Sequence, residues 1–168
     1  MNAAELLREL FGRIPDEIHR AIDGLSPADL VAAPVEGANP IGWLIWHLTR
    51  VQDHHVAELL DREQVWVGGV WPARFGLDAD PGNTGYGHRA AEVAMVQPDG
   101  VEALVGYYTA VAAATADLLA ATSADDLDRV VDDRWDPPVT LGARLVSIAD
   151  DDVQHAGQAA YARGLLGR

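Results

Sequence analysis

Apolar residues recur every three or four positions in four long stretches of this chain, and this spacing constrains its fold more than any other feature. The stretches are approximately residues 3–23, 40–61, 99–121 and 140–166. Each is long enough for five or more helical turns. Aromatic residues make up only 7% of the chain, which favours closely packed helices over a β-sandwich. The sequence therefore predicts an all-α protein.

Proline and small polar residues indicate where these helices begin and end. Asn39 can cap the second helix, and Thr140 can cap the fourth. Pro15, inside the first stretch, predicts a kink or a division of that helix. Residues 63–97 have no sustained period and form a long link, with a short helix expected near residues 89–94.

The length of this link predicts the topology. Its 35 residues can retrace a neighbouring helix, since a helix of about 22 residues spans about 33 Å. Parallel neighbouring helices require such a crossover, whereas antiparallel ones need only a short loop. We therefore expect a four-helix bundle of up-down-down-up topology, with the crossover between helices two and three. The 168 residues fit a single domain, residues 1–168.

Composition excludes several classes of function. The net charge of −14 repels phosphate backbones, so we expect no nucleic-acid partner. With no cysteine, the chain has no disulfide or cysteine nucleophile, and any thiol must come from a ligand. No long uncharged apolar run or basic leader is apparent, so we expect a cytoplasmic protein without a membrane partner. Val65, Trp66 and Trp71 can pack a homodimer interface or cover the bundle.

The fourth helix places a histidine on its apolar seam, because His155 follows the same spacing as Leu145 and Ile148. Asp151 lies four residues before His155, on the same helical face one turn away. Asp152 lies three residues before it and follows the strict apolar period. An ionised carboxylate among apolar neighbours needs a compensating charge. These patterns leave the choice between the two aspartates open.

A histidine on the second helix completes a candidate metal site. His47 lies in an apolar helical pattern beside two tryptophans. Two histidines and one carboxylate can bind a divalent ion while leaving coordination positions open for chemistry. Each residue alone also has a structural explanation. Either histidine can be a buried residue of the helical core, and the carboxylate can belong to a solvated acidic face or form an ion pair with Arg144 or an arginine of another helix. We interpret the combination as a metal site within the helical bundle.

Three further histidines are candidates for the surroundings of that site. His54 returns to the face of His47 two turns later, about 10 Å along the helix, which is too far to share one ion. We interpret His54 as pocket lining and leave the role of His55 open. His88 lies in a Gly-Tyr-Gly-His stretch of the link, where it can act as a catalytic proton carrier or form a structural turn.

Several segments resemble the DinB/YfiT-like family of metalloenzymes, and in particular its actinobacterial branch with mycothiol-dependent proteins. The segments at residues 22–26 (Ile-Asp-Gly-Leu-Ser) and 37–48, which contains Trp-His-Leu, carry the family resemblance. Residues 74–77, 84–88 (Thr-Gly-Tyr-Gly-His) and 155–158 (His-Ala-Gly-Gln) are similar to that branch. The resemblance extends over nearly the whole chain and implies a four-helix bundle of up-down-down-up topology.

The resemblance also implies a ligand set. It assigns metal binding to the histidine of the Trp-His-Leu motif, here His47, and to two residues one turn apart on the last helix. Those positions are Asp151 and His155 in this chain. Many relatives have histidine or glutamate at the first of them. Aspartate is shorter, so the ion would lie closer to the last helix or bind through water.

These observations predict an enzyme that binds a divalent metal, with zinc the expected ion and nickel, iron or manganese as alternatives. The metal would bind and deprotonate a small-molecule thiol, which the resemblance implies is mycothiol. The thiolate would attack an electrophilic substrate, in an S-transferase or isomerase reaction. The alternatives are a metal-dependent hydrolase, and a non-catalytic stress protein that binds a metal or small ligand in a closed site.

Overall fold

Helices account for most of the chain in the computed structural model, which describes residues 1–168. The helices are α1 (Ala3–Phe11), α2 (Ile14–Ile22), α3 (Pro27–Val31), α4 (Ile41–Leu60), α5 (Val65–Gly68), α6 (Trp71–Arg74), α7 (Ala90–Val93), α8 (Val101–Ala121), the 3₁₀ helix η1 (Asp125–Asp128) and α9 (Leu141–Leu165). The strands β1 (Val130–Asp132) and β2 (Val139–Thr140) form one short antiparallel pair. The prediction of an all-α protein is confirmed.

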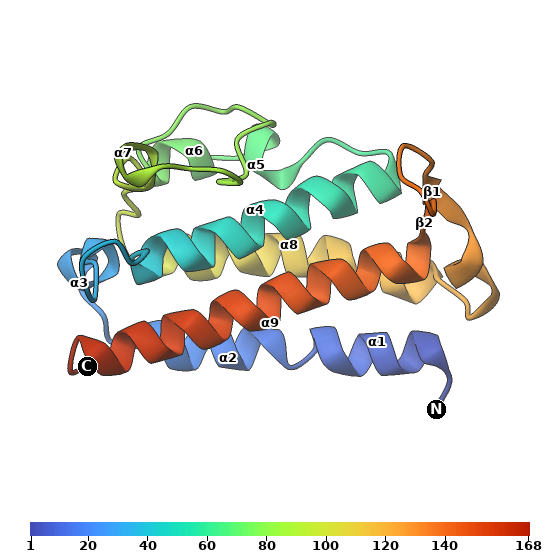
Figure 1. Cartoon of the computed structure of the whole chain (residues 1–168), viewed down its shortest axis with the longest axis horizontal. Coiled ribbons are helices and arrows are strands. Elements are labelled where there is room, and N and C mark those ends of the chain that lie inside the picture. Colours follow the sequence, from blue (N-terminus) through green and yellow to red (C-terminus); the bar gives the residue numbers. More distant parts are fainter.

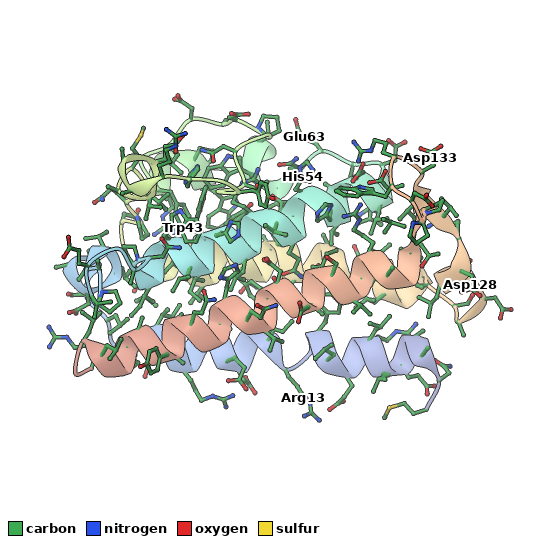
Figure 2. The ribbon with its side chains drawn as sticks, viewed as in Figure 1. Arg13, Trp43, His54, Glu63, Asp128 and Asp133 are labelled. Atoms are coloured by element: carbon green, nitrogen blue, oxygen red, sulfur yellow. The ribbon has the colours of Figure 1, made fainter.

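The first long stretch is divided into α1 and α2, as Pro15 predicts. Gly12 and Arg13 separate the two helices, and Arg13 marks the break in Figure 2. Pro15 lies in the first turn of α2. The N–H groups of a first turn have no partner within the helix, so the missing N–H of proline costs no hydrogen bond there. The break therefore follows from local sequence.

The sequence predicted the N-cap of α9 correctly but not that of α4. Thr140 caps α9, with its hydroxyl accepting a hydrogen bond from the Ala143 N–H at 3.2 Å. Asn39 does not cap α4, so that prediction is wrong. Pro40 occupies the cap position in an extended conformation and no side chain caps the helix. The carbonyl of Pro40 instead accepts the first hydrogen bond, from Leu44.

The long helices lie side by side along the longest axis of the molecule (Figure 1). Helix α9 packs on α4 and α2, and α8 packs on α4, α1 and α2. Helices α4 and α8 run in one direction, and α1, α2 and α9 run in the other (Figure 1). The link between α4 and α8 returns along α4 and carries α5, α6 and α7 (Figure 1). The predicted short helix near residues 89–94 is α7.

One helix, α8, is long and apolar enough to cross a membrane, with a mean hydropathy of 1.4 over its most apolar window. A buried core helix meets the same criteria. In the structure, Leu104, Tyr107, Val111 and Leu118 of α8 are buried in the hydrophobic core.

A buried arginine of α4 holds the link against the bundle. The Arg50 side chain is inaccessible to solvent and donates hydrogen bonds to the carbonyls of Asn83 and Pro81, each at 3.0 Å. Its charge is balanced by Asp53 at 3.3 Å. Trp66 is also fully buried and packs beside Arg50, so it covers the bundle within the chain. This anchoring determines which part of the link lies over α4.

Candidate metal centre

The structure brings together the three residues for which the sequence predicts metal binding. His47 of α4 and Asp151 and His155 of α9 each offer a ligand atom, and these atoms lie within 4.8 Å of one another. His47 is buried, whereas the side chains of Asp151 and His155 are 29% and 18% exposed. The cluster therefore lies at the edge of the core, within reach of a ligand from solvent.

Hydrogen bonds determine which ring nitrogen each histidine presents. His47 Nδ1 lies 2.6 Å from the carbonyl oxygen of Thr84, and His155 Nδ1 lies 2.8 Å from Oε1 of Gln158. These oxygens can only accept, so each Nδ1 carries the hydrogen and donates it. Both rings therefore keep the lone pair of Nε2 free, and Nε2 of His155 faces Oδ1 of Asp151 at 3.5 Å.

A glycine lets the link approach His47 closely enough to make this contact. Gly85 has a φ of +88°, and a Cβ atom there would lie 2.8 Å from both His47 Nδ1 and the Trp46 ring. Any side chain at this position would therefore combine backbone strain with a steric clash. The Thr84 carbonyl reaches His47 only because the next residue is glycine.

The donor set fits a divalent cation. Oδ2 of Asp151 is buried and has no hydrogen-bond partner, and such an oxygen is costly to leave unpaired. Burial lowers the pKa of His47, which favours the neutral, ligating form. Burial also lowers the pKa of His155, but interactions of the protonated ring with Asp151 and Gln158 outweigh it and raise the pKa overall. A cation between these three groups would satisfy the unpaired oxygen.

The two neighbouring aspartates occupy different environments. Asp152 is completely buried on the core side of α9, and neither carboxylate oxygen has a partner. Burial, with a smaller contribution from the charge of Asp151, raises the pKa of Asp152 well above its usual value. Burial therefore favours the uncharged form of the Asp152 carboxyl group. Of the two, Asp151 is the aspartate that lies with His47 and His155.

His88 lies in the wall around His47 and outside the three-residue cluster. Its Nδ1 accepts a hydrogen bond from Nε1 of Trp43 at 3.2 Å, so its Nε2 carries the hydrogen and donates to Oδ1 of Asn83 at 2.9 Å. The Trp43 ring stacks on the His47 ring, with centroids 4.6 Å apart. His88 thus connects the link to the tryptophan that packs against the metal ligand. Its predicted role as a proton carrier stays a prediction.

His54 and His55 form a separate cluster with Glu58, two turns further along α4. Figure 2 shows Trp43 and His54 on the side of α4 that the link covers. Nδ1 of His54 accepts a hydrogen bond from Nε2 of Gln64 at 3.2 Å, which occupies its only lone pair. Burial, with the nearby charge of Arg144, lowers the pKa of His55 to about 4. A positive neighbour and an occupied lone pair make this cluster a poor cation site.

Sequence reasoning missed the residues that orient the ligands. Thr84, Gly85 and Gln158 lie in the Thr-Gly-Tyr-Gly-His and His-Ala-Gly-Gln segments that carry the family resemblance. The resemblance of those segments to the family could therefore have indicated that these residues are functional. Their roles became visible only as contacts with His47 and His155.

Fold and site together define a helical protein with a candidate two-histidine, one-carboxylate metal centre. Comparison with known families is more specific, because the family described as Mycothiol-S-transferase matches residues 6–167. The chain therefore belongs to the mycothiol-S-transferase family, in agreement with the DinB/YfiT-like resemblance of its motifs.

A solved structure is similar over the full length. It is the crystal structure of a conserved protein from Enterococcus faecalis, with 30% sequence identity and a TM-score of 0.90. The match covers 100% of this chain and 99% of the other. A comparison with curated proteins found no match.

Proposed function

We propose that this protein is a divalent-metal-dependent S-transferase that uses mycothiol as its thiol. The observation that carries the proposal is the convergence of two histidines and an aspartate, one of whose oxygens has no hydrogen-bond partner, in a member of this family. Its partners are then the small-molecule thiol and an electrophilic substrate.

In this proposal, His47, Asp151 and His155 hold the metal, with zinc the expected ion and nickel, iron or manganese as alternatives. A divalent cation bound there would lower the pKa of a coordinated thiol, so that thiolate forms at neutral pH. Thr84 and Gln158 keep the Nε2 atoms available, and burial keeps His47 neutral. The chain itself supplies no competing thiol, because it contains no cysteine.

The proposed reaction joins the thiol sulfur to an electrophilic carbon. A new S–C bond forms, the leaving group departs with the electron pair of its bond to that carbon, and the thiol proton passes to solvent. The partly exposed side chains of Asp151 and His155 leave an approach for both reactants. His88 is a candidate for proton transfer only if one of its two hydrogen bonds opens.

The proposed scaffold is one domain over residues 1–168, a four-helix bundle of up-down-down-up topology. The packing of α9 on α4 and α2, and of α8 on α4, supports it. In such a bundle the ligands come from the facing sides of neighbouring helices, a common arrangement for metal sites in bundles.

Metal analysis tests the centre. Protein purified without chelator or affinity metal should contain about one divalent ion per chain, and His47→Ala and His155→Ala should each lose it. His54→Ala is the matched control, a histidine of the same helix that should leave the metal content unchanged. Full occupancy in both ligand variants would refute the site.

Thiol binding tests the reaction class. Cobalt-loaded protein should develop a thiolate-to-metal charge-transfer band when mycothiol is added. The affinity should rise with pH until the bound thiol is fully deprotonated, because binding releases a proton. A spectrum that does not respond to millimolar thiol would contradict the proposal, and turnover without thiol would favour a hydrolase.

A further inference from the structure

An apolar cavity lies beside the metal centre, between the first turns of α4 and the last turns of α9. Its volume is about 230 Å³, and its lining includes Val35, Ala38, Leu44, Gln158, Tyr161 and Leu165. We propose that this cavity binds the uncharged, apolar body of the electrophilic substrate. This inference rests on the proposed function and adds the chemical class of the second reactant.

The cavity begins about one helical turn from two of the candidate ligands. Leu44 lies three residues before His47 on α4, and Gln158 lies three residues after His155 on α9. Three residues advance a helix by about 4.5 Å. Because α4 and α9 run in opposite directions, both displacements point toward the same end of the molecule (Figure 1). A molecule in the cavity therefore lies within reach of the centre.

One side chain belongs to both the cavity and the metal centre. Gln158 lines the cavity, and its Oε1 accepts the hydrogen bond from Nδ1 of His155 at 2.8 Å. A residue of the cavity wall is thus in direct contact with a candidate metal ligand.

The lining indicates an uncharged occupant. Asn39 and Gln158 are the only residues in the lining with polar side chains apart from the Tyr161 hydroxyl, and none of the lining residues is charged. Val35, Tyr161 and Leu165 are 54%, 71% and 48% exposed, so large apolar side chains gather at this cavity. Clustered exposed apolar surface commonly marks a binding site.

The volume indicates the size of that occupant. An engineered apolar cavity of about 150 Å³ is known to hold benzene. A cavity of about 230 Å³ therefore accommodates a substituted benzene ring or a branched alkyl group.

On the other side of the metal centre from the cavity, α4 and α9 carry a group of polar side chains. His54, His55 and Glu58 of α4 lie two or more turns beyond His47, and Arg144 of α9 lies near His55. The two directions from the centre therefore differ in chemistry. The apolar reactant is expected at the cavity, and the polar part of the thiol at the other end.

Fluorine NMR with a small aromatic probe tests the cavity. We expect 4-fluorobenzyl alcohol to bind saturably to the metal-free and to the zinc-loaded protein. 4-Fluorobenzoate, a ring of similar size with a negative charge, should bind at least tenfold more weakly. Equal binding of the two probes would overturn the inference of an uncharged occupant.

Two cavity-filling variants locate the binding. Ala38→Phe places a ring in this cavity and should weaken binding of the alcohol at least tenfold. Ala116→Phe is the matched control, because Ala116 lines a different cavity of about 360 Å³ beside α8 and the break between α1 and α2. Tyr161→Ala, at an exposed position, should weaken binding without affecting the fold. Loss of binding in Ala116→Phe but not in Ala38→Phe would overturn the proposal.

Cobalt-loaded protein then distinguishes failure of this inference from failure of the proposed function. A probe in the cavity should show strong paramagnetic relaxation of its fluorine signal, and the effect should disappear in Ala38→Phe. Bound cobalt with a bound but unrelaxed probe would overturn the inference and leave the metal centre intact. Protein that binds the probe but no cobalt would overturn the metal centre, while the cavity site would stand on the metal-free measurements.

Discussion

At the scale of single residues, Asp151 and Asp152 are adjacent in sequence but differ in burial and in the groups they lie beside. Asp151→Asn removes the carboxylate from the candidate centre, so we expect metal affinity to fall at least about tenfold. Asp152→Asn exchanges a buried carboxyl group outside the cluster, whose charged form burial disfavours, for an uncharged amide of similar size, so the metal content should stay near that of the wild type. Metal competition with a chromophoric chelator measures both. The reverse ranking would show that Asp152 is the ligand.

A second prediction at this scale concerns the close approach of the link to His47. Gly85→Ala places a methyl group 2.8 Å from Nδ1 of His47, so the Thr84 carbonyl must retreat. Groups that orient metal ligands commonly contribute about 10- to 100-fold to affinity, and we expect a loss in that range. ¹⁵N NMR of the metal-free protein should show a mixed tautomer at His47.

Gly87→Ala is the control for that experiment. Gly87 has a similar φ of +76°, but nothing lies within 4 Å of a Cβ atom there. Both variants carry a backbone penalty of about 1–2 kcal/mol. If they weaken metal binding equally, general strain in the link, and not the contact with His47, is responsible.

At the scale of elements, Arg50 connects α4 to the link. Arg50→Met leaves Asp53 buried without its cation and releases the carbonyls of Asn83 and Pro81. We expect the free energy of unfolding to fall by about 3–5 kcal/mol, as when one partner of a buried pair is removed. Metal affinity should fall as well, because the neighbouring Thr84 contact loses its support. Urea denaturation measures the first effect and metal competition the second.

An exposed ion pair of the same type serves as the comparison. Arg74 bonds Asp99 at 2.8 Å and is 32% exposed, so Arg74→Met should cost less than about 1 kcal/mol. A loss of similar size in both variants would indicate that burial does not determine the strength of the Arg50 network.

At the scale of the whole molecule, His55 couples stability to pH. Burial lowers its pKa to about 4 in the folded protein, whereas the ordinary value is 6.5. The unfolded chain therefore binds a proton as the pH falls through 6.5, while the folded chain binds it only near pH 4. Stability must then decrease from about pH 6.5 down to pH 4.

We expect metal-free wild-type protein to lose about 2 kcal/mol more than His55→Gln between pH 7 and pH 5. Urea unfolding at the two pH values gives the difference directly, and other titrating groups cancel between the two proteins. A parallel decline in both would show that His55 is not the source of the acid sensitivity.

Local sequence determined the helices of this protein to a large extent. Apolar spacing and caps act within one or two turns, so the division at Pro15 and the start of α9 at Thr140 could be predicted. The four-residue helices α5 and α6 could not, because they are too short to show a period. They depend on the burial of Trp66 and Phe75 against Tyr107 of α8.

The candidate metal centre also depends partly on local sequence and partly on tertiary structure. The spacing of Asp151 and His155 is a property of one helix and is visible in the sequence, whereas the nearness of His47 requires α4 to pack on α9. Apolar spacing left the choice between the two adjacent aspartates open and the family resemblance favoured Asp151, but only the tertiary structure shows which of them lies with His47. The packing of α9 on both α4 and α2 sets its rotation, and a helical period of 3.6 residues cannot distinguish adjacent positions at the margin of a seam.

The contacts that orient the ligands also depend on tertiary structure. Thr84 meets His47 across 37 positions of sequence, through a link whose path is held by Arg50 and permitted by Gly85. Periodicity describes one helix at a time and carries no information about where a loop returns. The sequence by itself therefore determined the helices and the chemistry available on them, and the folded chain decided which of those groups meet.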